Sequence, residues 1–184
     1  MIGLLIVACE ITFWVFVLAG LFFRYILRAK RLGAAFLIGT PLIDLVLLAA
    51  TAVDLRNGAT ANVFHGLSAI YIGVSAAFGH SMIRWADVRF AHRFAGGPPP
   101  EPGPKYGLEH ARHERRMWYR HLLAWAIGCA LLYGMILYVG DAERTAQLFW
   151  TIRTWTVVLV VDFLISFSYT LWPRKEKGSS AAER

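Results

Sequence analysis

The sequence predicts an all-α membrane protein: a bundle of five transmembrane helices, with the N-terminus outside and the C-terminus in the cytoplasm. Of its 184 residues 57% are apolar and only 17% are charged. In soluble domains about 45–50% of the residues are apolar and about 25% are charged. The apolar residues are concentrated in runs long enough to cross a bilayer, and the basic residues gather in alternate connections between those runs. The length suits one domain, residues 1–184.

Five runs approach the length of about 20 mostly apolar residues that a membrane-crossing helix needs. We expect helices at about 2–23, 34–53, 62–83, 122–139 and 148–172. In the first run the basic residues follow the apolar stretch, so we expect an uncleaved anchor instead of a secretion signal. Residues 95–107 are rich in proline and glycine and should form an extended linker, and 173–184 a flexible cytoplasmic tail.

The distribution of lysine and arginine predicts the orientation by the positive-inside rule. Four of these residues lie between the first two helices, eight between the third and fourth, and four in the tail. The opposite connections hold only Arg56 and Arg144, and Arg153 lies inside the fifth helix. Of 19 basic residues 16 therefore share one side, in the alternation that five crossings require. The prediction is a multi-pass protein of a bacterial plasma (inner) membrane.

The polar segment before the fourth span, residues 108–120, is compatible with a helix. We interpret it as a short juxtamembrane helix, or an inward extension of the fourth span. Its arginines are expected to contact anionic lipid: Arg112, Arg115, Arg116 and Arg120. A weaker interpretation is a metal site, because side chains three residues apart share a helical face. Its ligands would be His110, His113 and Glu114.

Three carboxylates fall inside the predicted spans, where a charged group is costly unless it is paired, hydrated or protonated. We therefore expect them to face the interior of the bundle. The predicted intramembrane polar cluster consists of Glu10, Asp44, Asp162, Arg153, His65 and Asp54. Arg153 lies about 180° around the fifth helix from Asp162. It is expected to reach Asp54, Glu10 or His65 instead.

Helical spacing supports inward faces for two of these acids. Thr40, Asp44 and Thr51 share one face of the second helix, and Asp162 and Ser166 share one face of the fifth. Two roles fit this pattern and the sequence leaves both open. The polar groups fix how the helices pack through hydrogen bonds, or they line a small cavity for protons, a cation or a cationic solute.

Motifs for catalysis are lacking: the sequence has no glycine-rich phosphate loop, nucleophile elbow or strong metal motif. We therefore expect neither an enzyme nor a cofactor. Two alternatives remain open, an enzyme acting on lipid or quinone near His80, His113 and His121, and a haem held between His80 and His121. Cys9 and Cys129 lie in apolar runs and are expected to pack as small apolar side chains.

Several short motifs resemble a family of small integral membrane proteins from bacteria, of an actinobacterial type and sometimes labelled YmcC-like. They include Cys9-Glu10, Thr40-Pro41-Leu42-Ile43-Asp44, His65-Gly66-Leu67, Phe78-Gly79-His80 and Ser168-Tyr169-Thr170-Leu171-Trp172-Pro173. The resemblance covers nearly the whole chain. It implies a bacterial membrane protein and carries no particular activity with it.

The leading functional hypothesis is a non-enzymatic scaffold or an accessory subunit of a membrane complex. The alternative is a small transporter or channel that uses the intramembrane carboxylates. Expected partners are the lipid bilayer including anionic lipids, further copies of the chain and other membrane proteins. Nucleic acid is not expected, although the net charge is +7, because the basic residues follow the membrane topology.

Overall fold

The structure is a computed structural model that describes residues 2–94 and 96–174, without the side chains of residues 2–7, 9, 10, 64 and 94. Within this part the chain is entirely helical apart from its connections. The elements are α1 (Ile2–Leu21), the π-helical turn η1 (Phe22–Ile26), α2 (Lys30–Arg56), α3 (Val63–Phe94), α4 (Gly107–Val139) and α5 (Ala146–Leu171). Four of them, α2 to α5, are long and apolar enough to cross a membrane.

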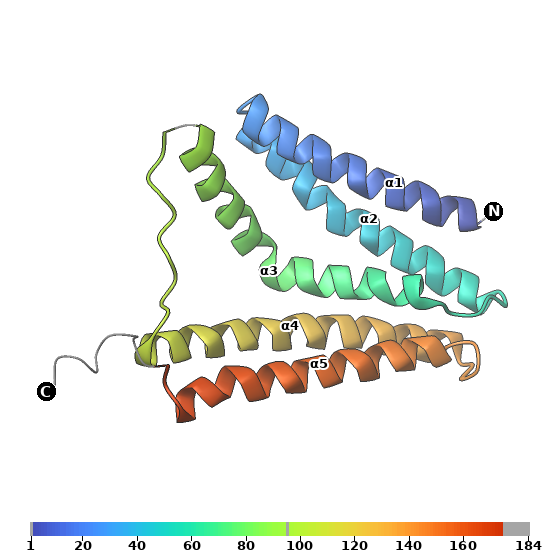
Figure 1. The fold of residues 1–184 in the computed structure, drawn as a ribbon. Coiled ribbons are helices and arrows are strands. Elements are labelled where there is room, and N and C mark those ends of the chain that lie inside the picture. The colour runs from blue at the N-terminus through green and yellow to red at the C-terminus, as the bar shows by residue number, and fades with distance from the viewer. Residues whose placement is uncertain (1, 95, 175–184) are drawn as a thin grey trace, which may run out of the picture.

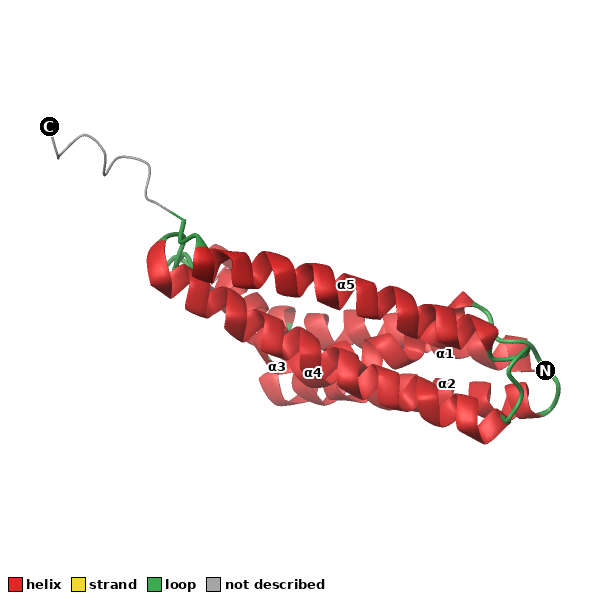
Figure 2. Cartoon of the chain, turned by 90° about the horizontal axis from the view of Figure 1, so that it is seen from below, coloured by secondary structure: helices red, strands yellow, loops and turns green. Residues whose placement is uncertain are grey.

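The helices form two antiparallel hairpins, α1–α2 and α4–α5, with α3 between them (Figures 1 and 2). The first half of α3 lies along α4, and its second half bends away towards the end of α1 (Figure 1). The connection 27–29, the linker 96–106 and the end of α5 lie at one end of the molecule (Figure 1), which we call the basic end. The connections 57–62 and 140–145 lie at the opposite end.

Glycines let the helices approach closely at two crossings. A Cβ on Gly33 of α2 would lie 2.7 Å from the carbonyl oxygen of Gly20 in α1. A Cβ on Gly73 of α3 would meet the carbonyl oxygen of Ala124 in α4 at less than van der Waals distance. Small residues are typical of helix interfaces in membranes, where close packing replaces the hydrophobic effect as the driving force.

The apolar core lies towards the opposite end of the molecule. Its largest fully buried side chains are Leu55 of α2, Leu132 of α4 and Leu148 of α5. Most other large apolar side chains are exposed on the helix surfaces, from Ile11 on α1 to Leu164 on α5. A surface of this composition is unfavourable in water and suits a bilayer.

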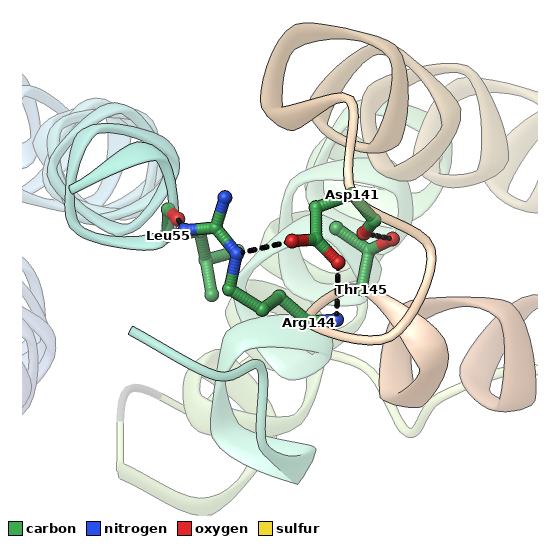
Figure 3. A network of polar contacts seen from close by, with 4 residues as sticks. All are labelled: Leu55, Asp141, Arg144 and Thr145. Atoms are coloured by element: carbon green, nitrogen blue, oxygen red, sulfur yellow. Dashed lines mark hydrogen bonds and ion pairs between the residues drawn. The ribbon is translucent and has the colours of Figure 1, made fainter. Parts of the chain in front are cut away.

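A polar network closes the opposite end (Figure 3). The Nη1 of Arg144 donates to the carbonyl oxygen of Leu55 over 2.7 Å, and its Nε donates to Oδ2 of Asp141 over 2.7 Å. The Thr145 hydroxyl donates to the Asp141 carbonyl oxygen over 2.6 Å. Arg144 thereby satisfies a carbonyl in the last turn of α2, where an α-helix leaves acceptors without intrahelical donors. It ties the α4–α5 connection to the first hairpin.

Two helices differ from their predicted bounds. α3 continues to Phe94 instead of ending near residue 83, and α4 begins at Gly107 instead of near residue 122. Of the two interpretations of residues 108–120, the structure shows the inward extension of the fourth span and no separate juxtamembrane helix, because these residues are the first part of α4. Hydropathy marks where a span leaves the apolar layer, whereas a helix continues until a residue such as glycine or proline breaks it.

Candidate functional site

The shortest polar contact between α4 and α5 in the described part joins His121 to Asp162. The imidazole Nδ1 of His121 lies 2.6 Å from Oδ2 of Asp162. Both side chains are partly exposed, and the Phe78 ring of α3 packs against the imidazole with ring centroids 5.0 Å apart. Three helices therefore meet at this pair. The contact was not predicted, because sequence separation gives no register between the two helices.

Indole groups add two further links between α4 and α5. Nε1 of Trp125 donates to the Thr156 hydroxyl over 3.1 Å, and Nε1 of Trp118 donates to the carbonyl oxygen of Leu159 over 3.3 Å. With His121–Asp162 these contacts form a row along the hairpin. The polar groups in these three contacts are all paired within the chain. Such pairing is typical of hydrogen bonds that fix how two helices pack.

A bidentate ion pair braces the basic end. The guanidinium of Arg24 in η1 holds both carboxylate oxygens of Asp87 in α3, with Nε 2.7 Å from Oδ1 and Nη2 on Oδ2. The adjacent ring of Tyr25 stacks on Phe90 at a centroid distance of 4.2 Å. Sequence reasoning missed this brace because both charged residues were assigned to connections, where surface pairs contribute little.

Asp44 of α2 has different surroundings. Its side chain is buried, with 4% of the residue exposed, and its Oδ2 has no hydrogen-bond partner among the described residues. Thr40 and Thr51 of the same predicted face are buried as well, whereas Asp54 is half-buried. No hydrogen bond or ion pair in the described part joins Asp44 to Asp162. The side chain of Glu10 lies outside the described residues.

His65 has a local role at the start of α3. The backbone N–H of Asn62 donates to His65 Nδ1 over 2.9 Å, and the backbone N–H of His65 donates to Asn62 Oδ1 over 3.3 Å. This reciprocal arrangement resembles a capping box, in which two otherwise unsatisfied donors at a helix start find acceptors. Arg153, in contrast, is exposed on α5, with its guanidinium carbon 5.1 Å from the Trp150 ring centroid. Within the described residues it forms no ion pair with Asp54 or His65.

The four arginines expected at lipid divide into two kinds. Nη1 of Arg115 donates to the Thr170 hydroxyl over 2.7 Å, and Nη1 of Arg120 donates to the Ser81 hydroxyl over 2.6 Å. These two tie α4 to α5 and to α3. Arg112 and Arg116 are exposed.

The described residues give no geometric support to a metal site on α4 or to a site between His80 and His121. His110 Nδ1 lies 3.7 Å from Glu114 Oε1 and 3.0 Å from the Pro104 carbonyl oxygen, whereas His113 is exposed. In the described part no three histidine, cysteine or acidic side chains gather as metal ligands. His80 is exposed, and the Nδ1 of His121 already faces Asp162.

One comparison with known proteins identifies the family. The chain is 47% identical over 179 residues to the "Uncharacterized membrane protein YmcC" of Bacillus subtilis (strain 168), which covers 97% of this chain and 96% of the relative. The chain belongs to the YmcC family. No model of a protein family and no solved structure matches it. This relative confirms the predicted resemblance. Together with the four long apolar helices, it identifies the chain as a multi-pass membrane protein.

Proposed function

We propose that the chain is a non-enzymatic scaffold or accessory subunit of a membrane complex in a bacterial plasma membrane. In this proposal it crosses the bilayer five times, with the N-terminus outside and the C-terminus in the cytoplasm. The basic residues support this orientation, because their connections alternate with connections that hold few of them. The apolar side chains of α1 and η1 between residues 11 and 26 support a fifth crossing.

The observation that carries the proposal is the uncovered surface of α5. Only Leu148, Leu159 and Ser166 of its 26 residues are buried. In the most apolar 18-residue stretch of α5, 6% of the residues are buried, against 22–28% in the corresponding stretches of α2, α3 and α4. An uncovered apolar face is compatible with lipid as well as with protein, so a second feature is needed to choose between them.

Arg153 is that feature. It is exposed on α5 about 10 Å from the helix start, at 1.5 Å per residue. An arginine that faces lipid within a span costs about 2.5–3.5 kcal/mol at the helix centre, and less near the ends, where the side chain reaches the interface. An acidic or carbonyl-rich partner would remove this cost. The interior contacts of α4 and α5 are already made within the chain, so α5 is free to present its outer face to a partner.

Site-specific photo-crosslinking in native membranes tests the proposal. A photoreactive residue replaces Val157 or Val161 on the exposed face of α5, and Val15 or Leu18 on the exposed face of α1 serves as the matched control. We expect one discrete protein adduct from the α5 positions and lipid adducts alone from α1. Lipid adducts alone from both helices would contradict a protein partner on α5.

The orientation has its own test. A reporter that is active only in the cytoplasm is fused after Arg184, and another is inserted at Gly58 in the connection between α2 and α3. Activity after Arg184 and none at Gly58 is expected. The reverse pattern would overturn the orientation, and activity at both sites would overturn the proposed number of crossings between them.

A second function, the movement of protons, a cation or a small cationic solute, is favoured by one observation. Asp44 is buried, and its Oδ2 lacks a hydrogen-bond partner in the described part. A carboxyl group in this position is less costly when it holds a proton or a cation. Reconstituted vesicles test this function by flux. Loss of flux in Asp44→Asn with retention in Asp54→Asn would favour transport, and equal flux in wild type and Asp44→Asn would exclude a role for Asp44.

A further inference from the structure

An open groove runs between the first hairpin and the second half of α3, near the basic end. One wall is α1 with η1, and the other is the part of α3 that bends away from α4 (Figure 1). Its volume is about 1090 Å³, which is slightly above the range of about 300–1,000 Å³ for small-molecule sites. The apolar lining includes Val15, Leu18, Phe22, Ile26, Trp85 and Phe90.

The groove walls are held at a fixed spacing by the brace described above. Arg24 and Tyr25 of η1 contact Asp87 and Phe90 of α3, so a bidentate ion pair and an aromatic stack join the two walls. The π-helical turn itself supplies part of the lining, including Phe22 and Ile26. Single π-helical turns are frequent at functional sites. The groove is therefore a built feature of the fold.

Charge is distributed unevenly along the groove. Arg89 and Arg93 of α3 are the two basic residues in its otherwise mostly apolar lining, and none of the described residues that line it is acidic. The guanidinium carbon of Arg89 lies 3.9 Å from the Trp85 ring centroid, which holds this cation beside the apolar lining. Arg89 forms no salt bridge within the described part of the chain. The nearest acid on α3, Asp87, is occupied by Arg24.

The length of the apolar part matches one leaflet of a bilayer. From Val15 to Ile26 the wall spans about 16 Å at 1.5 Å per residue. The hydrocarbon core of a bilayer is about 30 Å thick, so one leaflet is about 15 Å. A membrane-crossing helix of a partner would run past both ends of so short a groove. An acyl chain of one leaflet matches its length.

We propose that this groove binds one phospholipid with an anionic headgroup, whose acyl chain lies along α1 and α3 and whose phosphate contacts Arg89 and Arg93. The apolar walls pack against the acyl chain of the lipid. The two guanidinium groups bind its phosphate through charge-assisted hydrogen bonds. The proposal is independent of the scaffold function, because the groove and the exposed face of α5 are on different helices.

Native mass spectrometry of the purified full chain, titrated with phosphatidylglycerol or phosphatidylcholine, tests the proposal. We expect one phosphatidylglycerol to be retained in preference to phosphatidylcholine. Since each basic residue near an anionic lipid contributes about 1 kcal/mol, which corresponds to roughly fivefold in affinity, Arg89→Gln with Arg93→Gln should weaken binding of phosphatidylglycerol roughly 25-fold. The double variant Arg31→Gln with Arg84→Gln, which alters exposed arginines outside the groove, should leave it unchanged.

Two further variants keep the test independent of folding defects. Arg89→Lys with Arg93→Lys keeps both charges and should retain most of the preference for phosphatidylglycerol. Ala86→Trp fills the apolar part of the groove and should reduce retention of both lipids. Equal retention of the two lipids by the wild type, or equal loss in the Gln pair of the groove and the Gln pair outside it, would overturn the proposal. So would a second copy of the chain crosslinked to Trp85 in the groove.

Discussion

The imidazole Nδ1 of His121 and the carboxylate Oδ2 of Asp162 lie 2.6 Å apart and join the middle of α4 to α5. A carboxyl group within a span has thereby acquired a partner on the neighbouring helix. Because this contact uses the side chain that transport would otherwise need, it favours a structural role for Asp162. Its contribution to stability is accessible to measurement.

Removal of either member of this pair should destabilise the α4–α5 hairpin. In a double-mutant cycle with His121→Ala and Asp162→Ala we expect a coupling free energy of about 0.6–1.7 kcal/mol, the range for polar contacts between membrane helices. Thermal or denaturant unfolding in detergent supplies the four values. A coupling of zero would show that the two groups do not interact in solution.

The brace between Arg24 and Asp87 should depend on bidentate geometry. Arg24→Lys keeps the charge but cannot hold both carboxylate oxygens in one plane, so it should lose part of the stability that Arg24→Ala loses. Swapping the two residues should restore stability only partly, because η1 and α3 present different backbones. Unfolding curves of the three variants test this order. Arg84→Ala, an exposed arginine of α3, is the control and should change the free energy of unfolding by less than about 0.5 kcal/mol.

Gly73 and Gly134 both lie within helices, but an added methyl group is expected to have opposite effects at the two positions. Gly73→Ala would press on the Ala124 carbonyl oxygen and should destabilise the α3–α4 crossing by about 1–3 kcal/mol. Gly134→Ala on α4 meets open space and should stabilise the helix by up to about 1 kcal/mol. The free energy of unfolding of each variant decides the matter. Equal effects at the two positions would contradict the close approach of α3 to α4.

The ion pair in the α4–α5 connection predicts an acid dependence. The backbone N–H and the guanidinium of Arg144 hold the pKa of Asp141 below its ordinary value. A carboxyl whose pKa is lower in the folded state stabilises the fold above its unfolded pKa of about 3.9. This stabilisation is lost as the pH falls through the folded pKa.

Unfolding of wild type and Asp141→Asn between pH 7 and pH 2 measures this effect. The difference in stability between them should be constant above about pH 5 and should shrink as the pH falls through the folded pKa, as the carboxyl becomes protonated in both states. Glu143→Gln alters an exposed acid in the same connection and serves as the control. A difference that persists unchanged at pH 2 would assign the effect to packing instead of charge.

The sequence predicts the helices well because each span is a property of a continuous segment. The apolar runs and the spacing of Thr40, Asp44 and Thr51 are local, and these three side chains are buried together in the structure. The pairs His121–Asp162 and Arg24–Asp87 were not predictable, because they depend on the register between helices. The end of α3 was missed for a different reason, since hydropathy measures the apolar layer and residues 84–94 are helical beyond it. Residues 108–120 were expected to be helical, but hydropathy left open whether they continue the fourth span.

His65 shows the same limit at a single residue. Its place among apolar residues suggested a member of a polar cluster, whereas its ring and backbone cap the start of α3 together with Asn62. The signal for a cap was present, because an asparagine three residues before a hydrogen-bonding side chain is a pattern of helix starts.

The mass of the assembly extracted from native membranes in lipid nanodiscs tests the scaffold proposal most directly. We predict a particle that contains this chain together with another protein or a further copy. Arg153→Leu should shift the population towards the single chain, whereas Arg56→Leu, at the end of α2, should not. A single chain surrounded by lipid in the wild type, with no change in Arg153→Leu, would contradict the account.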